Sequence, residues 1–100
     1  MYIAMNKFKI IKGQEQNFEN LWKERESLLG TVEGFIQFHL IKGVNGQEYT
    51  VYMSHSTWSS KDHFENWTRS NSFKKAHKNA GKNRHMYVGH PVFEGFEVII

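Results

Sequence analysis

The sequence predicts a single α+β domain of the ferredoxin-like βαββαβ order, spanning residues 1–100. Three observations predict it. A chain of 100 residues can bury one hydrophobic core and is too short for two. Apolar residues alternate over the first ten residues and recur at helical spacing in two later stretches. An Asn-Gly pair lies between the two central strands, which is typical of a β-hairpin turn.

The first ten residues have the alternation of a half-buried strand. Ala4 and Phe8 fall on one face, whereas Ile3 and Met5 fall on the other. Gly13 ends the pattern. We therefore expect an N-terminal strand whose two faces are both partly apolar.

A helix and a hairpin follow. Apolar residues at helical spacing over 18–29 predict the helix, and Gly30 provides its C-terminal stop. A strand is expected over 35–42, followed by the Asn-Gly turn and a returning strand over 49–58. The returning strand is rich in β-branched and aromatic residues.

The second helix begins after the hairpin. Ser59 and Ser60 are its N-cap candidates, and Phe64 and Trp67 lie on its apolar side. The Ser-Asn-Ser of residues 70–72 either breaks or re-caps this helix.

Helical spacing then resumes from Phe73 through His77 and stops at Gly81. Residues 82–92 are expected to form a loop, and 93–100 the final strand. The resulting order of elements is that of the split βαβ fold.

Two helices can cover only one face of a four-stranded sheet, yet the predicted strands are apolar on both faces. The second face therefore needs a cover. The same face of another copy would supply one, which predicts a two-fold homodimer. A moderately apolar open face on a monomer is the alternative.

Composition excludes several classes of protein. The chain has no cysteine, so it has neither a disulfide framework nor a thiolate metal site. Its opening residues lack the pattern of a secretory signal, and no apolar run approaches the ~20 residues that span a bilayer. We expect a cytoplasmic protein with no membrane partner.

The positive charge is local. Net charge is +3, and no Asp or Glu occurs between Asn66 and Phe93. Six of the 13 cations lie in that stretch: Arg69, Lys74, Lys75, Lys78, Lys82 and Arg84. This clustering points to one anionic partner at one place, although a solvated helix face would look the same.

Nucleic acid is a weak candidate for that partner. RNA-recognition domains share this topology and stack bases on aromatic side chains. Here the third strand reads EYTVYMSHSTW, which lacks the RNP motif. We therefore expect no nucleic-acid partner.

Two residues stand out on the predicted inner surface. Asn6 shares a strand face with Ala4 and Phe8, where a buried amide must either bond to neighbouring backbone or point into a cavity. Trp67 is either core or a large rigid surface for a flat ligand.

His77 is the best metal-ligand candidate of six histidines. It lies beside an apolar stripe near a helix C-terminus, where a charged surface histidine is the alternative. A lone histidine makes a poor zinc site. It suits haem, in which the porphyrin supplies four nitrogens and the protein one axial imidazole. The nearby cations would then face the haem propionates.

Asn6 and the stretch FENWTRSNSFKKAHKN, residues 64–79, resemble the IsdG-type haem-degrading monooxygenases of the antibiotic biosynthesis monooxygenase (ABM) superfamily. Chain length, element order and the VEGF segment of residues 32–35 also fit. Asn6, Trp67 and His77 match the Asn, Trp and His of that family at the expected spacings.

The resemblance implies a dimeric α/β barrel in which each subunit binds one haem between its helices and its sheet. His77 would be the axial ligand of the haem iron. Trp67 would press the porphyrin out of plane, and Asn6 would hydrogen-bond the bound oxygen on the distal side. The other haem-binding residues would be Phe64, Phe73 and Arg84.

The resemblance also implies the reaction. Haem would be both cofactor and substrate, and O₂ with electrons from a separate reductase would open the ring and release iron. Two alternatives remain: a cofactor-independent ABM oxygenase of a small organic substrate, and a haem-binding or storage protein without turnover.

Overall fold

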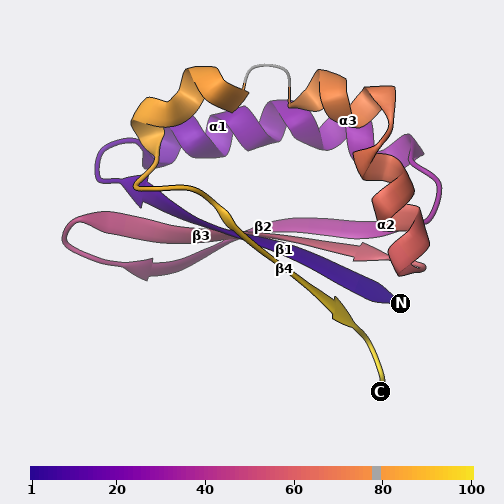
Figure 1. Ribbon diagram of the computed structural model, residues 1–100. Helices are drawn as coiled ribbons and strands as arrows, with labels where there is room; N and C mark the ends of the chain where they lie inside the picture. Colours follow the sequence, from indigo (N-terminus) through magenta and orange to yellow (C-terminus); the bar gives the residue numbers. More distant parts are fainter. Residues whose placement is uncertain (78–79) are drawn as a thin grey trace.

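The computed structural model describes residues 1–77 and 80–100, with side chains throughout except at 25–28, 76 and 80–82. The described chain forms one antiparallel sheet with helices packed over one face (Figure 1). No helix in the described part of the chain is long and apolar enough to cross a membrane.

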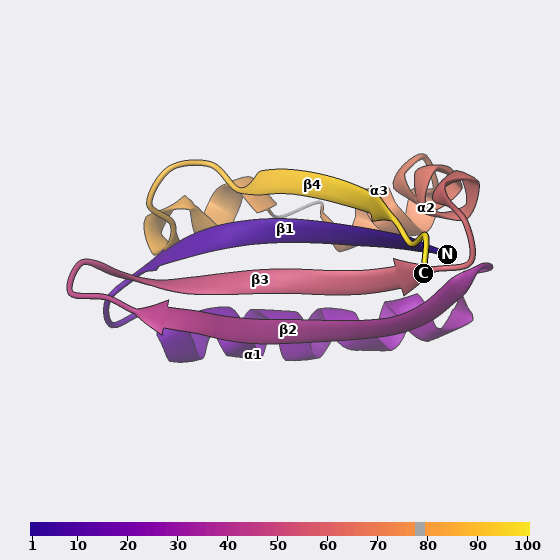
Figure 2. The same cartoon turned by 90° about the horizontal axis from the view of Figure 1, so that it is seen from below.

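The sheet has four strands in the order β2-β3-β1-β4, and each neighbouring pair is antiparallel. Figure 2 shows this order from the side that carries no described helix. This arrangement confirms the ferredoxin-like prediction. The strands are β1 (Tyr2–Ile11), β2 (Phe35–Asn45), β3 (Tyr49–Trp58) and β4 (Val92–Glu97).

The helices lie in two groups over the sheet (Figure 1). One group holds α1 and the short 3₁₀ segment η1 that continues it, and the other holds α2, α3 and η2. Their bounds are α1 (Glu15–Arg25), η1 (Glu26–Thr31), α2 (Lys61–Thr68), α3 (Asn71–Ala76) and η2 (Ala80–Met86).

Serine residues cap the N-termini of α2 and α3. Ser60 accepts a hydrogen bond from the amide of His63 and starts α2, and Ser70 accepts one from Phe73 and starts α3. The predicted re-capping near residue 70 is confirmed. Ser59 precedes the cap, and its amide donates to the Gly34 carbonyl at 2.8 Å.

The prediction of one helix over 18–29 ending at Gly30 is wrong. The α-helix ends at Arg25, and the chain tightens into η1, which contains Gly30. Gly30 does not take the left-handed conformation; Gly34 does, with φ of +83°. A Cβ at Gly34 would collide with the His63 ring, so only glycine fits at this entry to β2.

The predictions for the C-terminal third also need correction. Residues 82–92 are not all loop, because η2 runs to Met86 and Tyr87 bridges to β1. The last strand is β4, which starts at Val92 and ends at Glu97. Glu97 pairs with Tyr2, the first residue of β1, so 98–100 have no further strand residue to pair with.

The inner face of the sheet carries two separate hydrophobic clusters. Along β1, Ala4 belongs to one cluster and Phe8 to the other, and Asn6 lies between them. The first cluster consists of Tyr2, Ala4, Leu29 and Trp58. The second consists of Phe8, Ile10, Phe18, Tyr52 and Met86. The fold therefore has an interrupted core, and the interruption lies at Asn6.

One carboxylate ties the start of α1 to the hairpin. Glu15 accepts a hydrogen bond from the Gly13 amide at 2.7 Å and one from the Thr50 hydroxyl at 3.1 Å. Hydrogen bonds from its own amide and from that of Gly13 lower the pKa of Glu15 from 4.5 to about 2.

This lowered pKa predicts a pH dependence of folding. The stabilisation by ionised Glu15 is present above pH 4.5 and is lost as pH falls towards about 2. Glu15→Gln should therefore make the decline in unfolding free energy between these two pH values shallower. Urea titrations at pH 5 and pH 3 would measure it, and an unchanged decline would contradict the assignment.

Candidate functional site

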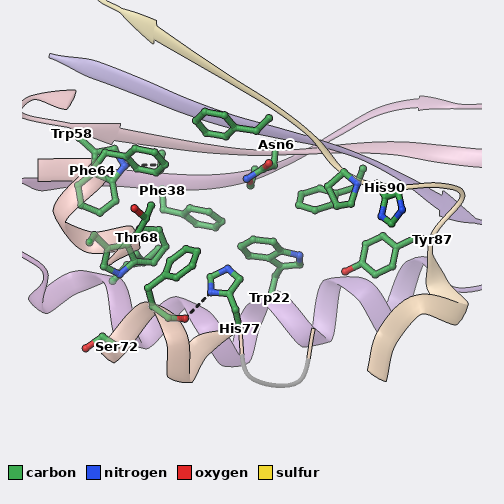
Figure 3. Close-up of a pocket in the computed structure, with 18 of the residues that line it drawn as sticks. Asn6, Trp22, Phe38, Trp58, Phe64, Thr68, Ser72, His77, Tyr87 and His90 are labelled. Carbon is green, nitrogen blue, oxygen red and sulfur yellow. Dashed lines mark hydrogen bonds between the residues drawn. The ribbon is translucent and has the colours of Figure 1, made fainter. Parts of the chain in front are cut away.

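A cavity of about 920 Å³ lies between the sheet and the helices, at the interruption of the core. Ligand sites typically enclose ~300–1,000 Å³, so this cavity has room for a large organic molecule. Most of its walls are aromatic, including Phe8, Trp22, Phe38, Trp58, Phe64 and Phe73. Figure 3 shows rings from the sheet and from both groups of helices around the space.

The structure brings all six predicted site residues to this one cavity. They come from β1, α2, α3 and η2, which are far apart in the sequence. The residues are Asn6, Phe64, Trp67, Phe73, His77 and Arg84.

His77 follows α3 directly, as its C-cap. Its Nδ1 lies 2.8 Å from the Phe73 carbonyl oxygen. Because a carbonyl only accepts, Nδ1 carries the proton, and Nε2 is the nitrogen with the lone pair in the neutral ring. Metal-bound histidines characteristically donate their other ring nitrogen in this way.

Aromatic packing fixes the orientation of the His77 ring. It stacks on Phe73 with ring centroids 4.0 Å apart and planes 24° from parallel, and Trp67 packs edge-on at 6.1 Å. Figure 3 shows His77 rising from the helix side of the cavity while Asn6 projects from β1 on the opposite side. The imidazole and the amide therefore bracket the space between helices and sheet.

Trp67 lies near the end of α2 and packs against three further rings besides that of His77. Its ring centroid is 4.8 Å from that of Phe73, 5.4 Å from Trp58 and 6.3 Å from Phe64. The indole is half-buried and lines the cavity. It is both part of the packing and a rigid face for a flat ligand.

Asn6 is half-buried and lines the cavity. Its side chain has no hydrogen-bond partner among the described residues. The sequence left two interpretations of the Asn6 amide: a hydrogen bond to neighbouring backbone, or a position facing a cavity. The described chain shows the second.

The described lining of the cavity carries positive charge and no negative charge. None of its described lining residues is acidic, and Arg84, an exposed residue, supplies a cation at the wall. Of the other cations in this stretch, Arg69 pairs with Glu65 at 3.7 Å, and Lys78 and the Lys82 side chain lie outside the part of the chain that the structure describes.

The other histidines are arranged differently. His63 packs against Gly34 and its Nδ1 lies 2.7 Å from the Ser60 hydroxyl. His39 and His55 pair across β2 and β3. Among the described residues of the cavity wall, His90 is the second histidine, and it is exposed.

No group of three or more His, Cys, Asp or Glu side chains in the described chain could hold a bare metal ion. A single imidazole does fit a metal whose other ligands come with the cofactor. The flat aromatic walls, the oriented His77 and the cation at Arg84 together fit a planar, anionic, metal-containing ligand such as haem.

Sequence reasoning missed several lining residues. Trp22 and Phe38 stack with centroids 5.4 Å apart and planes 13° from parallel, and both line the cavity. Trp22 was visible only as one member of an apolar helical stripe. Tyr87 and His90 lie in a segment predicted as loop, where no periodic signal marks the residues that turn inwards.

Comparison with known proteins agrees with this geometry. The family model described as antibiotic biosynthesis monooxygenase matches residues 1–79. The chain is 36% identical over 80 residues to a heme-degrading monooxygenase from Halalkalibacterium halodurans and 32% identical over 84 residues to one from Bacillus mycoides. These matches cover 77% and 81% of this chain, but 66% and 75% of the two relatives.

Two solved structures share the fold. The heme degrader MhuD from Mycobacterium tuberculosis, with two hemes bound in its active site, superposes with a TM-score of 0.76 over 100% of this chain and 97% of its own, at 21% identity. SnoaB, a cofactor-independent oxygenase from Streptomyces nogalater, gives 0.71 over 99% and 94%, at 14% identity. Overall shape is thus common to proteins with different chemistry, and the residues in the cavity must distinguish them.

Proposed function

Because the chain belongs to the antibiotic biosynthesis monooxygenase family, we propose that it is a haem-degrading monooxygenase, which binds haem as cofactor and substrate and opens the porphyrin ring. One observation carries the proposal. Asn6, Trp67 and His77, from three separate elements, line one aromatic cavity, and His77 has the hydrogen bond of a metal-ligating histidine.

The helix side of the cavity would hold the haem. His77 provides the axial nitrogen, and its bond to the Phe73 carbonyl keeps Nε2 as the donor atom. The Trp67 indole, fixed by its ring neighbours, presents a surface that a planar ring must accommodate. Arg84 supplies a positive charge for a propionate.

The sheet side would govern the chemistry. Haem supplies the redox-active iron for O₂ and, in its ring, the carbon that is oxidised. Asn6 offers an amide hydrogen bond in an apolar space, where such a bond is stronger than in water.

Electrons are expected from a separate reductase. The sequence contains no Gly-x-Gly-x-x-Gly fingerprint with which to bind a nicotinamide or flavin dinucleotide.

A hemin titration tests the proposal against the cofactor-independent alternative. We expect a shifted Soret band that saturates near one hemin per chain, with quenching of the tryptophan fluorescence. Hemin that only partitions weakly, without a saturating Soret shift, would favour an oxygenase of another substrate.

We also propose a homodimer through the sheet face that carries no described helix. Ile41, Val92 and Phe96 on the strands of this sheet are exposed by 45%, 57% and 48%. Apolar patches on this scale are usually covered by a partner. A second copy can cover its own equivalent face by two-fold symmetry.

Light scattering at tens of micromolar should therefore give about twice the chain mass of 11.8 kDa. Phe96→Glu should shift the mass towards the monomer, whereas Val44→Glu, near the hairpin and 74% exposed, should not. A monomeric wild-type protein at that concentration would refute the dimer.

A further inference from the structure

Two of the hydroxyl groups that line the cavity are hydrogen-bonded within the protein. Ser56 donates to the Ala4 carbonyl at 3.3 Å and accepts from the Trp58 indole at 2.9 Å. Thr68 donates to the Glu65 carbonyl at 2.7 Å. These two hydroxyls are therefore engaged within the protein.

Ser54 is different. It is only 6% exposed and lines the cavity, and its hydroxyl has no hydrogen-bond partner in the part of the chain that the structure describes. The Ser54 oxygen is not sealed inside the protein, and it opens onto the cavity. A ligand in the cavity can supply the missing bond.

Ser54 is also placed beside Asn6. The two residues are direct cross-strand partners of β3 and β1, so their Cβ atoms are ~4.5–5.5 Å apart, and both side chains line the cavity. Neither side chain makes a hydrogen bond within the described chain. A polar pair thus lies on the sheet side of a cavity whose walls are mainly aromatic.

We propose that Ser54 and Asn6 form one site for a small hydrogen-bonding ligand, a water molecule or a small anion, on the sheet side of the bound haem. The Asn6 amide donates, and the Ser54 hydroxyl donates or accepts as the ligand requires. Ser54 is then a further substrate-positioning residue of the same reaction. The inference rests on the proposed function, because the haem forms the other wall of the site.

Azide binding to the ferric hemin complex tests this directly, since azide is small and accepts hydrogen bonds. Ser54→Ala should weaken azide binding about tenfold, the effect of one hydrogen bond to a charged ligand, and leave hemin affinity unchanged. Ser54→Thr, which keeps a hydroxyl, should retain the affinity. Thr68→Val, whose lost hydroxyl already bonds to backbone, is the matched control and should also retain it.

A double-mutant cycle tests whether one azide ion contacts both the Asn6 amide and the Ser54 hydroxyl. If it does, the combined loss in Asn6→Ala/Ser54→Ala will differ from the product of the single losses. Ser54→Ala should not lower the thermal midpoint, because no described protein bond is broken.

The outcomes separate the two proposals. Hemin that fails to saturate the wild-type protein overturns the proposed function and this inference with it. Saturating hemin with unchanged azide affinity in Ser54→Ala, or with no azide binding at all, overturns this inference alone. A clear drop in the thermal midpoint of Ser54→Ala would also overturn it, since the hydroxyl would then serve the fold.

Discussion

His77→Ala is expected to lower haem turnover by ~100-fold or more, beyond the ~10–100-fold that loss of an outer partner of a metal ligand costs. The variant loses an imidazole that is oriented in the cavity by a backbone carbonyl and a stacked ring. The aromatic walls remain, so hemin should still enter, with lower affinity and an altered Soret band. Added imidazole should restore part of the wild-type spectrum.

His90→Ala is the matched control for this variant, because His90 is the other histidine in the described cavity wall. It should keep the wild-type Soret maximum. His63→Ala should do the same, since its ring packs against Gly34 and bonds to Ser60. Loss of the Soret band in His90→Ala, with His77→Ala unaffected, would move the axial ligand to His90.

Asn6→Ala is expected to keep hemin affinity and slow ring opening by about tenfold or more. The amide faces the cavity and is unbonded in the described chain, so its loss should fall on a state formed during the reaction. Hemin titration and single-turnover rates would separate the two effects.

Equal losses of hemin affinity and of rate in Asn6→Ala would assign the amide a structural role. Thermal unfolding provides the control. A buried amide without a protein partner can be replaced by alanine at little cost, whereas one that bonds the fold together cannot.

Local rules predicted most of the fold. Alternation located β1, and β-branched and aromatic composition located β3. The Asn-Gly pair located the hairpin, and the serine caps located α2 and α3. The predictions were wrong at ends of elements that are set by pairing with distant parts of the chain. The end of β4 depends on where β1 begins, and a single sequence does not display that register.

The site was predictable in part. Asn6 was visible as a polar residue on an apolar strand face, and Trp67 and His77 through the family resemblance. Ser54 gave no such signal, because serine in a strand is ordinary until the cross-strand register places it opposite Asn6. Trp22 and Phe38 could not be identified as cavity residues from the sequence. Apolar periodicity predicts which residues face inwards, but it does not predict which of them line a cavity.

Reduction of the hemin complex in air tests most directly whether the protein degrades haem or only stores it. The complex is treated with ascorbate in the presence of catalase, which removes free hydrogen peroxide, and followed by absorbance and mass spectrometry. Our account predicts that the Soret band decays, that an open-chain tetrapyrrole appears and that iron becomes available to a chelator. A Soret band that persists, with intact haem recovered from the protein, would contradict it.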